Sequence, residues 1–133
     1  MTSTNRLDLI PQQLWLTVNP DRTIATLNFQ LEKNRNAIST AVAAELSALS
    51  EALAGDNNQH PAIEFLEKEK LMVLALRSGC KGVFLSGGNL YDLATLSAEE
   101  GELFTNQMRR FTDLLRSSPF VTVALLNGIS AGG

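Results

Sequence analysis

The sequence contains very few of the residues that usually signal secretion or metal binding. Its 133 residues include one cysteine, Cys80, one histidine, His60, one tryptophan and one tyrosine. A single cysteine excludes an internal disulfide, so a reducing, cytoplasmic location is the expectation. Because one cysteine and one histidine give no metal-ligand spacing, we predict no metal site. Without a paired histidine motif, Cys80 is not expected to act as a nucleophile.

Positive charge and long apolar runs are also scarce. Eleven Lys and Arg residues against fourteen Asp and Glu residues give a net charge of −3, with no basic cluster. This balance argues against nucleic acid as the main partner. The longest apolar runs, 71–76 and 121–126, are far too short to cross a bilayer, so no membrane partner is expected. No apolar stretch accompanies Arg6 and Asp8, so we expect no secretory signal.

The remaining composition is that of a folded domain. Hydrophobic residues make up 44% of the chain and charged residues 19%, which is typical of a globular protein rather than a disordered one. The length fits one domain. Residues 1–13 are polar and weakly patterned, so we predict a flexible N-terminal arm there and place the domain at 14–133.

Strand and helix patterns alternate along this domain. In order, the expected elements are an antiparallel strand pair at 14–18 and 24–29, a helix at 40–54, a short helix at 62–70, a buried strand at 71–76, a short strand at 83–85, a turn or two of helix at 90–96, a helix at 97–116 and a buried strand at 121–126. Ser39 or Thr40 suits the start of the first long helix and Gly55 its end. Ser97 and Glu100 have the capping-box spacing. Strands that alternate with helices indicate an α/β fold with some parallel pairing.

Two glycine pairs follow apolar runs, Gly87-Gly88 and Gly132-Gly133. Glycine puts no side chain before the backbone, so N–H groups there are free to point at a ligand. Ligands gather where the strands of such sheets end, and two N–H donors aimed at one oxygen form an oxyanion hole. A plain tight turn is the more frequent explanation of a glycine pair. From the spacing alone, both interpretations and an unrelated phosphate-binding turn stay open.

Three segments resemble the motifs of the enoyl-CoA hydratase/isomerase (crotonase) family, in the family's order. Residues 34–38 (NRNAI) are similar to its R-N-A-[LI], residues 83–90 (VFLSGGNL) to F-x-A-G-A-D-L, and residues 119–133 (PFVTVALLNGISAGG) to K-P-x-I-A-A-x-N-G-x-A-x-G-G-G. The resemblance runs from about Leu14 to the last residue, with an insertion around 60–68. It implies a crotonase-like ββα spiral, of which this chain is the N-terminal portion, truncated at the second glycine motif.

The resemblance also implies a function and a site. It implies an enzyme that binds an acyl-CoA thioester and stabilises its enolate, an enoyl-CoA hydratase or isomerase when complete. Coenzyme A enters as part of the substrate, with no further cofactor, and the full-length protein is expected to be a homo-oligomer, a trimer or hexamer. Carried over by motif, the two N–H donors are Gly88 and Gly133, and the substrate-binding residues are Lys33, Arg35, Asn36, Ala37, Ser86, Gly87, Asn89 and Leu90.

Departures from the family pattern leave an alternative open. Asn89 stands where the family commonly has aspartate, and Gly88 where it has alanine. The acid/base carboxylates of family hydratases follow the second glycine run, so this chain is expected to lack them. Glu99 and Glu100 are expected to serve the helix start rather than catalysis. The alternative is an incomplete half-domain that binds CoA or a partner chain without chemistry, with residues 121–126 poorly covered.

Overall fold

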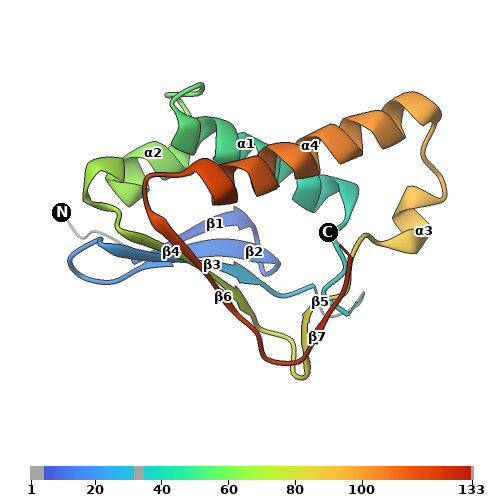
Figure 1. Cartoon of the computed structure of the whole chain (residues 1–133), viewed down its shortest axis with the longest axis horizontal. Helices are drawn as coiled ribbons and strands as arrows, with labels where there is room; N and C mark the ends of the chain where they lie inside the picture. The colour runs from blue at the N-terminus through green and yellow to red at the C-terminus, as the bar shows by residue number, and fades with distance from the viewer. Residues whose placement is uncertain (1–4, 32–34, 133) are drawn as a thin grey trace.

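A five-stranded sheet carries the helices on one face (Figure 1). The computed structural model describes residues 5–31 and 35–132, so the predictions for Lys33 and Gly133 lie outside the described residues. The strands of the large sheet, in spatial order, are β1 (Arg6–Ile10), β2 (Leu14–Val18), β3 (Ile24–Phe29), β4 (Val73–Ser78) and β6 (Val121–Leu125). A second, two-stranded sheet pairs β5 (Val83–Leu85) with β7 (Ile129–Ser130) in parallel.

The pairing pattern confirms the predicted α/β architecture. β1, β2 and β3 form an antiparallel meander, whereas β3 pairs with β4 and β4 with β6 in parallel. Parallel neighbours need long crossovers. Helices α1 (Thr40–Ala54) and α2 (Pro61–Leu66) lie in the first crossover. β5, α3 (Leu90–Leu93) and α4 (Ala98–Ser117) lie in the second.

The prediction of a flexible arm over residues 1–13 is wrong for its described part. Residues Arg6–Ile10 form β1, which pairs with β2. Leu7 and Leu9 pack partly buried against the core, while Arg6 and Asp8 are exposed. This alternation of apolar and charged residues is the period of a half-buried strand, and it was readable in the sequence.

The core lies between the sheet and helices α1 and α4. Buried leucines of α1, among them Leu46, Leu49 and Leu53, share one cluster with Leu16 and Leu27 of the sheet. The helix starts where predicted, because the Ser39 hydroxyl accepts a hydrogen bond from the Val42 N–H at 3.2 Å. It ends at Gly55, whose φ of 89° is the left-handed value that glycine adopts without strain. α1 also packs along α4.

The short helix expected at 62–70 is divided in two. α2 ends at Leu66, and a 3₁₀ turn follows at Lys68–Lys70. Between them Glu67 has a φ of 47°, which breaks the helix. Its carboxylate forms ion pairs with Arg22 at 3.0 Å and with Lys70 at 2.9 Å. A contact with Arg22 in the β2–β3 turn therefore helps to hold this break. Because Arg22 is distant in the sequence, the residues around Glu67 alone do not predict it.

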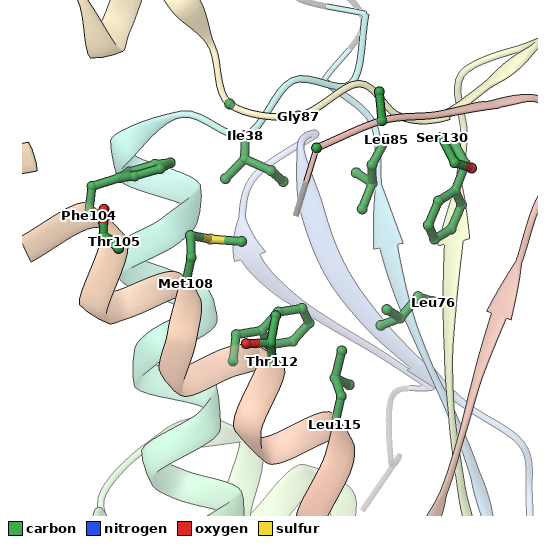
Figure 2. A pocket seen from close by; sticks show the side chains of 15 residues that line it. Ile38, Leu76, Leu85, Gly87, Phe104, Thr105, Met108, Thr112, Leu115 and Ser130 are labelled. Atoms are coloured by element: carbon green, nitrogen blue, oxygen red, sulfur yellow. The ribbon is translucent and has the colours of Figure 1, made fainter.

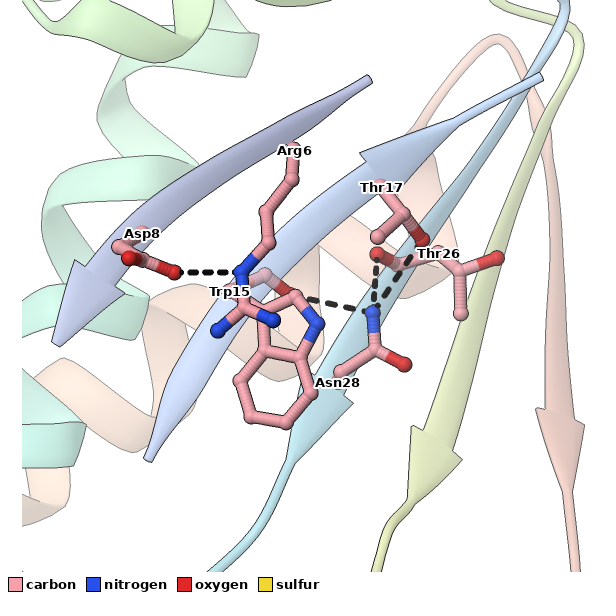
Figure 3. A network of polar contacts seen from close by, with 6 residues as sticks. All are labelled: Arg6, Asp8, Trp15, Thr17, Thr26 and Asn28. Carbon is pink, nitrogen blue, oxygen red and sulfur yellow. Dashed lines mark hydrogen bonds and ion pairs between the residues drawn. The ribbon is translucent and has the colours of Figure 1, made fainter. Parts of the chain in front are cut away.

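The face of the sheet opposite the helices carries a polar network on β1, β2 and β3 (Figure 3). The guanidinium of Arg6 lies over the Trp15 ring, 4.3 Å from its centroid, and bonds Asp8 at 2.8 Å. The amide of Asn28 donates to Thr17 Oγ1 at 3.3 Å and to neighbouring backbone carbonyls. Polar side chains therefore cover this face of the sheet on β1, β2 and β3 (Figure 3).

The strand β6 is exposed rather than buried, contrary to the prediction for 121–126. Val121, Leu125 and Leu126 are 62%, 47% and 65% exposed. β6 is the edge of the large sheet, and no described element covers its outer face. The companion expectation, that this strand has little cover, is confirmed. Among the described residues, no helix combines the length and apolar character needed to cross a membrane.

Candidate functional site

The two glycine motifs meet where the short sheet ends. β5 and β7 pair in parallel, and the Ala131 N–H donates to the Leu85 carbonyl at 3.0 Å. Just beyond, a Cβ added to Gly132 would lie 2.8 Å from the Cα of Gly87. Both residues have positive φ, 96° for Gly87 and 79° for Gly132. Close backbone contact and left-handed conformation therefore both require glycine here. The expectation that the two glycine pairs lie together where the strands end is confirmed for Gly87 and Gly132.

The N–H of Gly88 has no acceptor among the described residues. Gly88 forms a parallel bridge with Ile38, in which the Ile38 N–H donates to Gly87 O at 2.7 Å and the Asn89 N–H donates to Ile38 O at 2.8 Å. In such a bridge Gly88 lies between the two residues that make the bonds, and its own N–H points away from Ile38. The backbone on both sides is fixed, so this donor is preorganised.

A hollow of about 490 Å³, here named the glycine cleft, gathers most of the predicted site residues. It is lined by Arg35, Ala37, residues 86–91 and Gly132. Apart from Asn36, every predicted site residue that the structure describes therefore lines one cleft. Arg35 is exposed there and is the one positively charged residue in the described lining of the cleft. The cleft has the size typical of a small-molecule site.

Asn36 does not reach the cleft, so its predicted substrate-binding role is corrected. The residue is completely buried. Its Nδ2 donates to Ser78 Oγ at 2.8 Å and to Phe84 O at 2.7 Å, and its Oδ1 accepts from Leu31 N–H at 2.7 Å. These bonds join the ends of β3, β4 and β5. The side chain is fully engaged in holding the loop that carries Arg35 and Ala37.

The side chain of Asn89 also serves the backbone. Its Oδ1 accepts from the N–H groups of Tyr91 and Asp92, at 3.1 and 3.2 Å, and so caps α3. The neutral amide does here what Asn residues commonly do at helix starts. Asp92 in turn accepts from the Thr40 N–H at 2.6 Å, which ties α3 to the start of α1. The backbone of Asn89 is engaged as well, because its N–H donates to Ile38 O at 2.8 Å and its carbonyl accepts from the Leu93 N–H at 2.9 Å.

A second hollow, which the sequence analysis missed, lies on the other side of the glycines (Figure 2). This apolar hollow has a volume of about 460 Å³ and shares Gly87, Gly88 and Gly132 with the glycine cleft. Its remaining wall consists of Ile38, Leu76, Phe84, Leu85, Phe104, Thr105, Met108, Phe111, Thr112, Leu115, Ser130 and Ala131. The spacing of the α4 residues predicted an apolar helix face but not that part of it borders open space.

No Asp or Glu lies among the described residues that line the glycine cleft or the apolar hollow. Glu100 caps α4, as expected: hydrogen bonds from the Ser97 backbone N–H and hydroxyl hold the pKa of its carboxyl below the usual range. His60 caps α2, where its Nδ1 accepts from the Ala62 N–H at 3.0 Å. No group of three or more described His, Cys, Asp or Glu residues is placed to hold a metal ion. The chemistry that this part of the chain offers is backbone hydrogen bonding beside an apolar wall.

The architecture is that of the crotonase fold, in its N-terminal portion. A structure of enoyl-CoA hydratase from Bacillus anthracis superposes with a TM-score of 0.69 at 18% identity, covering 90% of this chain and 41% of that one. A structure of an enoyl-CoA hydratase/carnitine racemase from Magnetospirillum magneticum superposes with a TM-score of 0.69 at 21% identity. The match covers 95% of this chain and 41% of that one. The predicted fold class is thus confirmed.

Sequence comparisons point to the same group of proteins. The chain is 30% identical over 121 residues to the mitochondrial enoyl-CoA hydratase domain-containing protein 2 of Bos taurus, covering 91% of this chain and 37% of that protein. It is 25% identical over 113 residues to the mitochondrial methylglutaconyl-CoA hydratase of Homo sapiens. That match covers 85% of this chain and 30% of that protein. No family model matches the chain.

The resemblance to the enoyl-CoA hydratase/isomerase family is therefore confirmed for the N-terminal portion of its fold. The chain spans only about 37% of the length of the first of these relatives. The names of these relatives place them in mitochondria, so a cytoplasmic location of this chain is not confirmed and stays a prediction.

Proposed function

We propose that this chain forms the thioester-binding part of an enzyme that acts on acyl-CoA, a hydratase or isomerase of 2-enoyl-CoA. The observation that carries the proposal is the fixed N–H of Gly88, which has no acceptor among the described residues and lies between the glycine cleft and the apolar hollow. A thioester carbonyl at that point gains negative charge as its enolate forms. One preorganised donor stabilises such a charge by about 3–4 kcal/mol. Gly133 is the proposed second donor.

The glycine cleft is the proposed place of the CoA moiety. Arg35 lines this cleft, and Lys33 is two residues away in the sequence. Their positive charges suit the phosphates of CoA, although an exposed ion pair contributes at most about 1 kcal/mol. Coenzyme A is thus substrate, and the proposal includes no other cofactor. A homo-oligomer, trimer or hexamer, remains part of the proposal for a full-length protein.

Binding without chemistry is the second candidate. It is favoured by one observation: neither hollow is lined by an Asp or Glu among the described residues. Hydration needs a group that moves a proton to or from carbon, and the backbone does not supply one. Calorimetric titration with butyryl-CoA, followed by an assay with crotonyl-CoA, separates the candidates. Affinity with turnover supports the first, and affinity without turnover supports the second.

The Gly88 donor is tested by a matched pair of substitutions. Gly88→Pro removes the N–H and breaks no described hydrogen bond, so we expect kcat with crotonyl-CoA to fall by about 10²–10³. Gly88→Ala keeps the N–H. Its Cβ would meet Leu93 Cδ1 at 2.6 Å, and this flexible side-chain end can turn aside.

The rate is followed by the loss of ultraviolet absorbance of the conjugated thioester, and circular dichroism checks the fold of both variants. Equal rates in the proline and alanine variants would contradict the role of the Gly88 N–H. If the wild-type protein binds without turnover, the same pair is compared by affinity for butyryl-CoA, where proline alone is expected to weaken binding.

A further inference from the structure

Beyond the glycines, the described side chains of the apolar hollow bring no charge, and each hydroxyl hydrogen already has an acceptor. Its side-chain hydroxyls already have partners: Thr105 donates to Gly101 O at 3.0 Å and Thr112 donates to Arg109 O at 3.0 Å, both within α4. The Ser130 hydroxyl donates to Gly128 O at 3.5 Å. None of the described wall residues is ionisable. A charged group placed inside would lose its hydration without gaining a partner.

The hollow is long and begins at the glycines. Figure 2 shows Gly87 at one end, with Phe104, Met108, Thr112 and Leu115 following one another along α4 toward the other end. These α4 positions span eleven residues, or about 16 Å at 1.5 Å per residue. An extended hydrocarbon chain advances by roughly 1.25 Å per carbon, from ordinary bond lengths and angles. The hollow is therefore long enough for about twelve carbons.

We infer that the apolar hollow selects the acyl group by length and charge. It accepts an uncharged, straight acyl chain of up to about twelve carbons and rejects an acyl group that ends in a carboxylate. The inference rests on the proposed function, because the thioester at Gly88 is what places the acyl chain at the mouth of the hollow. Thr112 lies past its middle, so that side chain is positioned to limit the length.

Affinity is expected to rise with each carbon until the hollow is full. Complete burial of a methylene group strengthens binding about fourfold. Met108, Thr112 and Leu115 are only partly buried, so one side of a bound chain keeps contact with water. We therefore expect about twofold per methylene, or about 10²-fold between butyryl-CoA and dodecanoyl-CoA, and no further gain with tetradecanoyl-CoA.

The test is a calorimetric titration of the purified protein with free CoA, the butyryl, octanoyl, dodecanoyl and tetradecanoyl thioesters, and glutaryl-CoA. Thr112→Phe narrows the hollow past its middle and should abolish the gain in affinity beyond octanoyl-CoA, measured relative to the affinity of the same variant for butyryl-CoA. Asn106→Phe, on the exposed side of α4, is the matched control and should behave as wild type. Thr112→Leu serves the same purpose if the phenylalanine variant does not fold.

Three results would overturn the inference while the proposed function stands: equal affinity for butyryl-CoA and dodecanoyl-CoA, tighter binding of glutaryl-CoA than of butyryl-CoA, or equal effects of the Thr112 and Asn106 substitutions. Failure of free CoA and of every thioester to bind would instead remove the proposed function, and the inference with it.

Discussion

Asn36 shows how one buried side chain shapes the site without touching a ligand. Its φ of 58° lies in the left-handed region, which asparagine tolerates better than most residues. Its amide bonds reach Leu31, Ser78 and Phe84, which come from three separate parts of the chain. Residues 36–38 are thereby fixed against β5 and the glycine pair that follows it. Arg35 and Ala37 owe their places at the cleft to this residue.

Replacing Asn36 is expected to destabilise the whole protein. Asn36→Ala leaves the Leu31 N–H and the Phe84 carbonyl without partners in the interior and puts alanine at a positive φ. We expect the free energy of unfolding to fall by about 3 kcal/mol. Urea denaturation measures it, with the exposed Asn58→Ala as control, for which a change within about 0.5 kcal/mol is expected. A similarly small change for Asn36→Ala would show that water replaces its bonds.

At the scale of the element, the first turn of α4 depends on a reciprocal pair of hydrogen bonds. The Glu100 N–H donates to the Ser97 hydroxyl at 3.1 Å, and the Ser97 N–H donates to the Glu100 carboxylate at 2.9 Å. This capping box fixes where α4 starts. The remaining turns of the helix follow from it. The register of Phe104, Met108 and Leu115 against the apolar hollow is therefore set at Ser97.

The capping box makes stability depend on pH. Hydrogen bonds from Ser97 lower the folded-state pKa of Glu100 below 4.5, its value without them. A lowered folded pKa means that the stabilisation is complete above 4.5 and is lost as the pH falls through the folded pKa. Glu100→Gln should therefore be less stable than wild type at neutral pH, and the two should converge well below pH 4.5. Urea denaturation at both pH values tests this, with Glu99→Gln as the charge-matched control. A difference that is unchanged by acid would contradict the assignment.

Elements with strong local signals were predicted well. The β2–β3 hairpin, α1 and α4 have caps, turns and periodic apolar residues within their own sequence. The errors lie where distant contacts decide. The alternation of β1 is visible but short, and its pairing with β2 makes it a strand; α2 was predicted too long because the ion pair of Arg22 with Glu67 is not local. β6 has the apolar pattern of a buried strand, and only the strand order shows that it lies at an edge.

At the scale of the whole molecule, the site is a product of topology. The glycine pairs were visible in the sequence, and the family resemblance indicated their use. Their contact, however, depends on the β5–β7 pairing across more than forty residues. The apolar hollow needs α4 and two sheets together, so no stretch of sequence predicts it. Asn36 was misassigned because its motif position and its fully buried environment give opposite indications, and only the structure decides between them.

The two edge strands of the large sheet, β1 and β6, expose side chains of different character. β1 carries Arg6 and Asp8 on its outer face, and charged side chains discourage pairing with another sheet. β6, the opposite edge, presents Val121, Val123 and Leu125 to solvent. A row of exposed apolar residues beside unpaired backbone groups favours association with a second copy. The chain is thus expected to self-associate through β6 at high concentration.

A lysine on this edge should suppress that association. Val121 is 62% exposed, so Val121→Lys costs little packing and places a charge on the outer face of β6. Light scattering should show a mass that rises with concentration for the wild-type protein and a constant mass near 14.4 kDa for the variant. Leu103→Lys is the matched control: Leu103 is 57% exposed on α4, away from the sheet edge, and its replacement should leave the association unchanged. A wild-type protein that stays monomeric and melts cooperatively would show that the exposed strand is stable without cover, and equal suppression by both lysines would assign the effect to net charge rather than to β6.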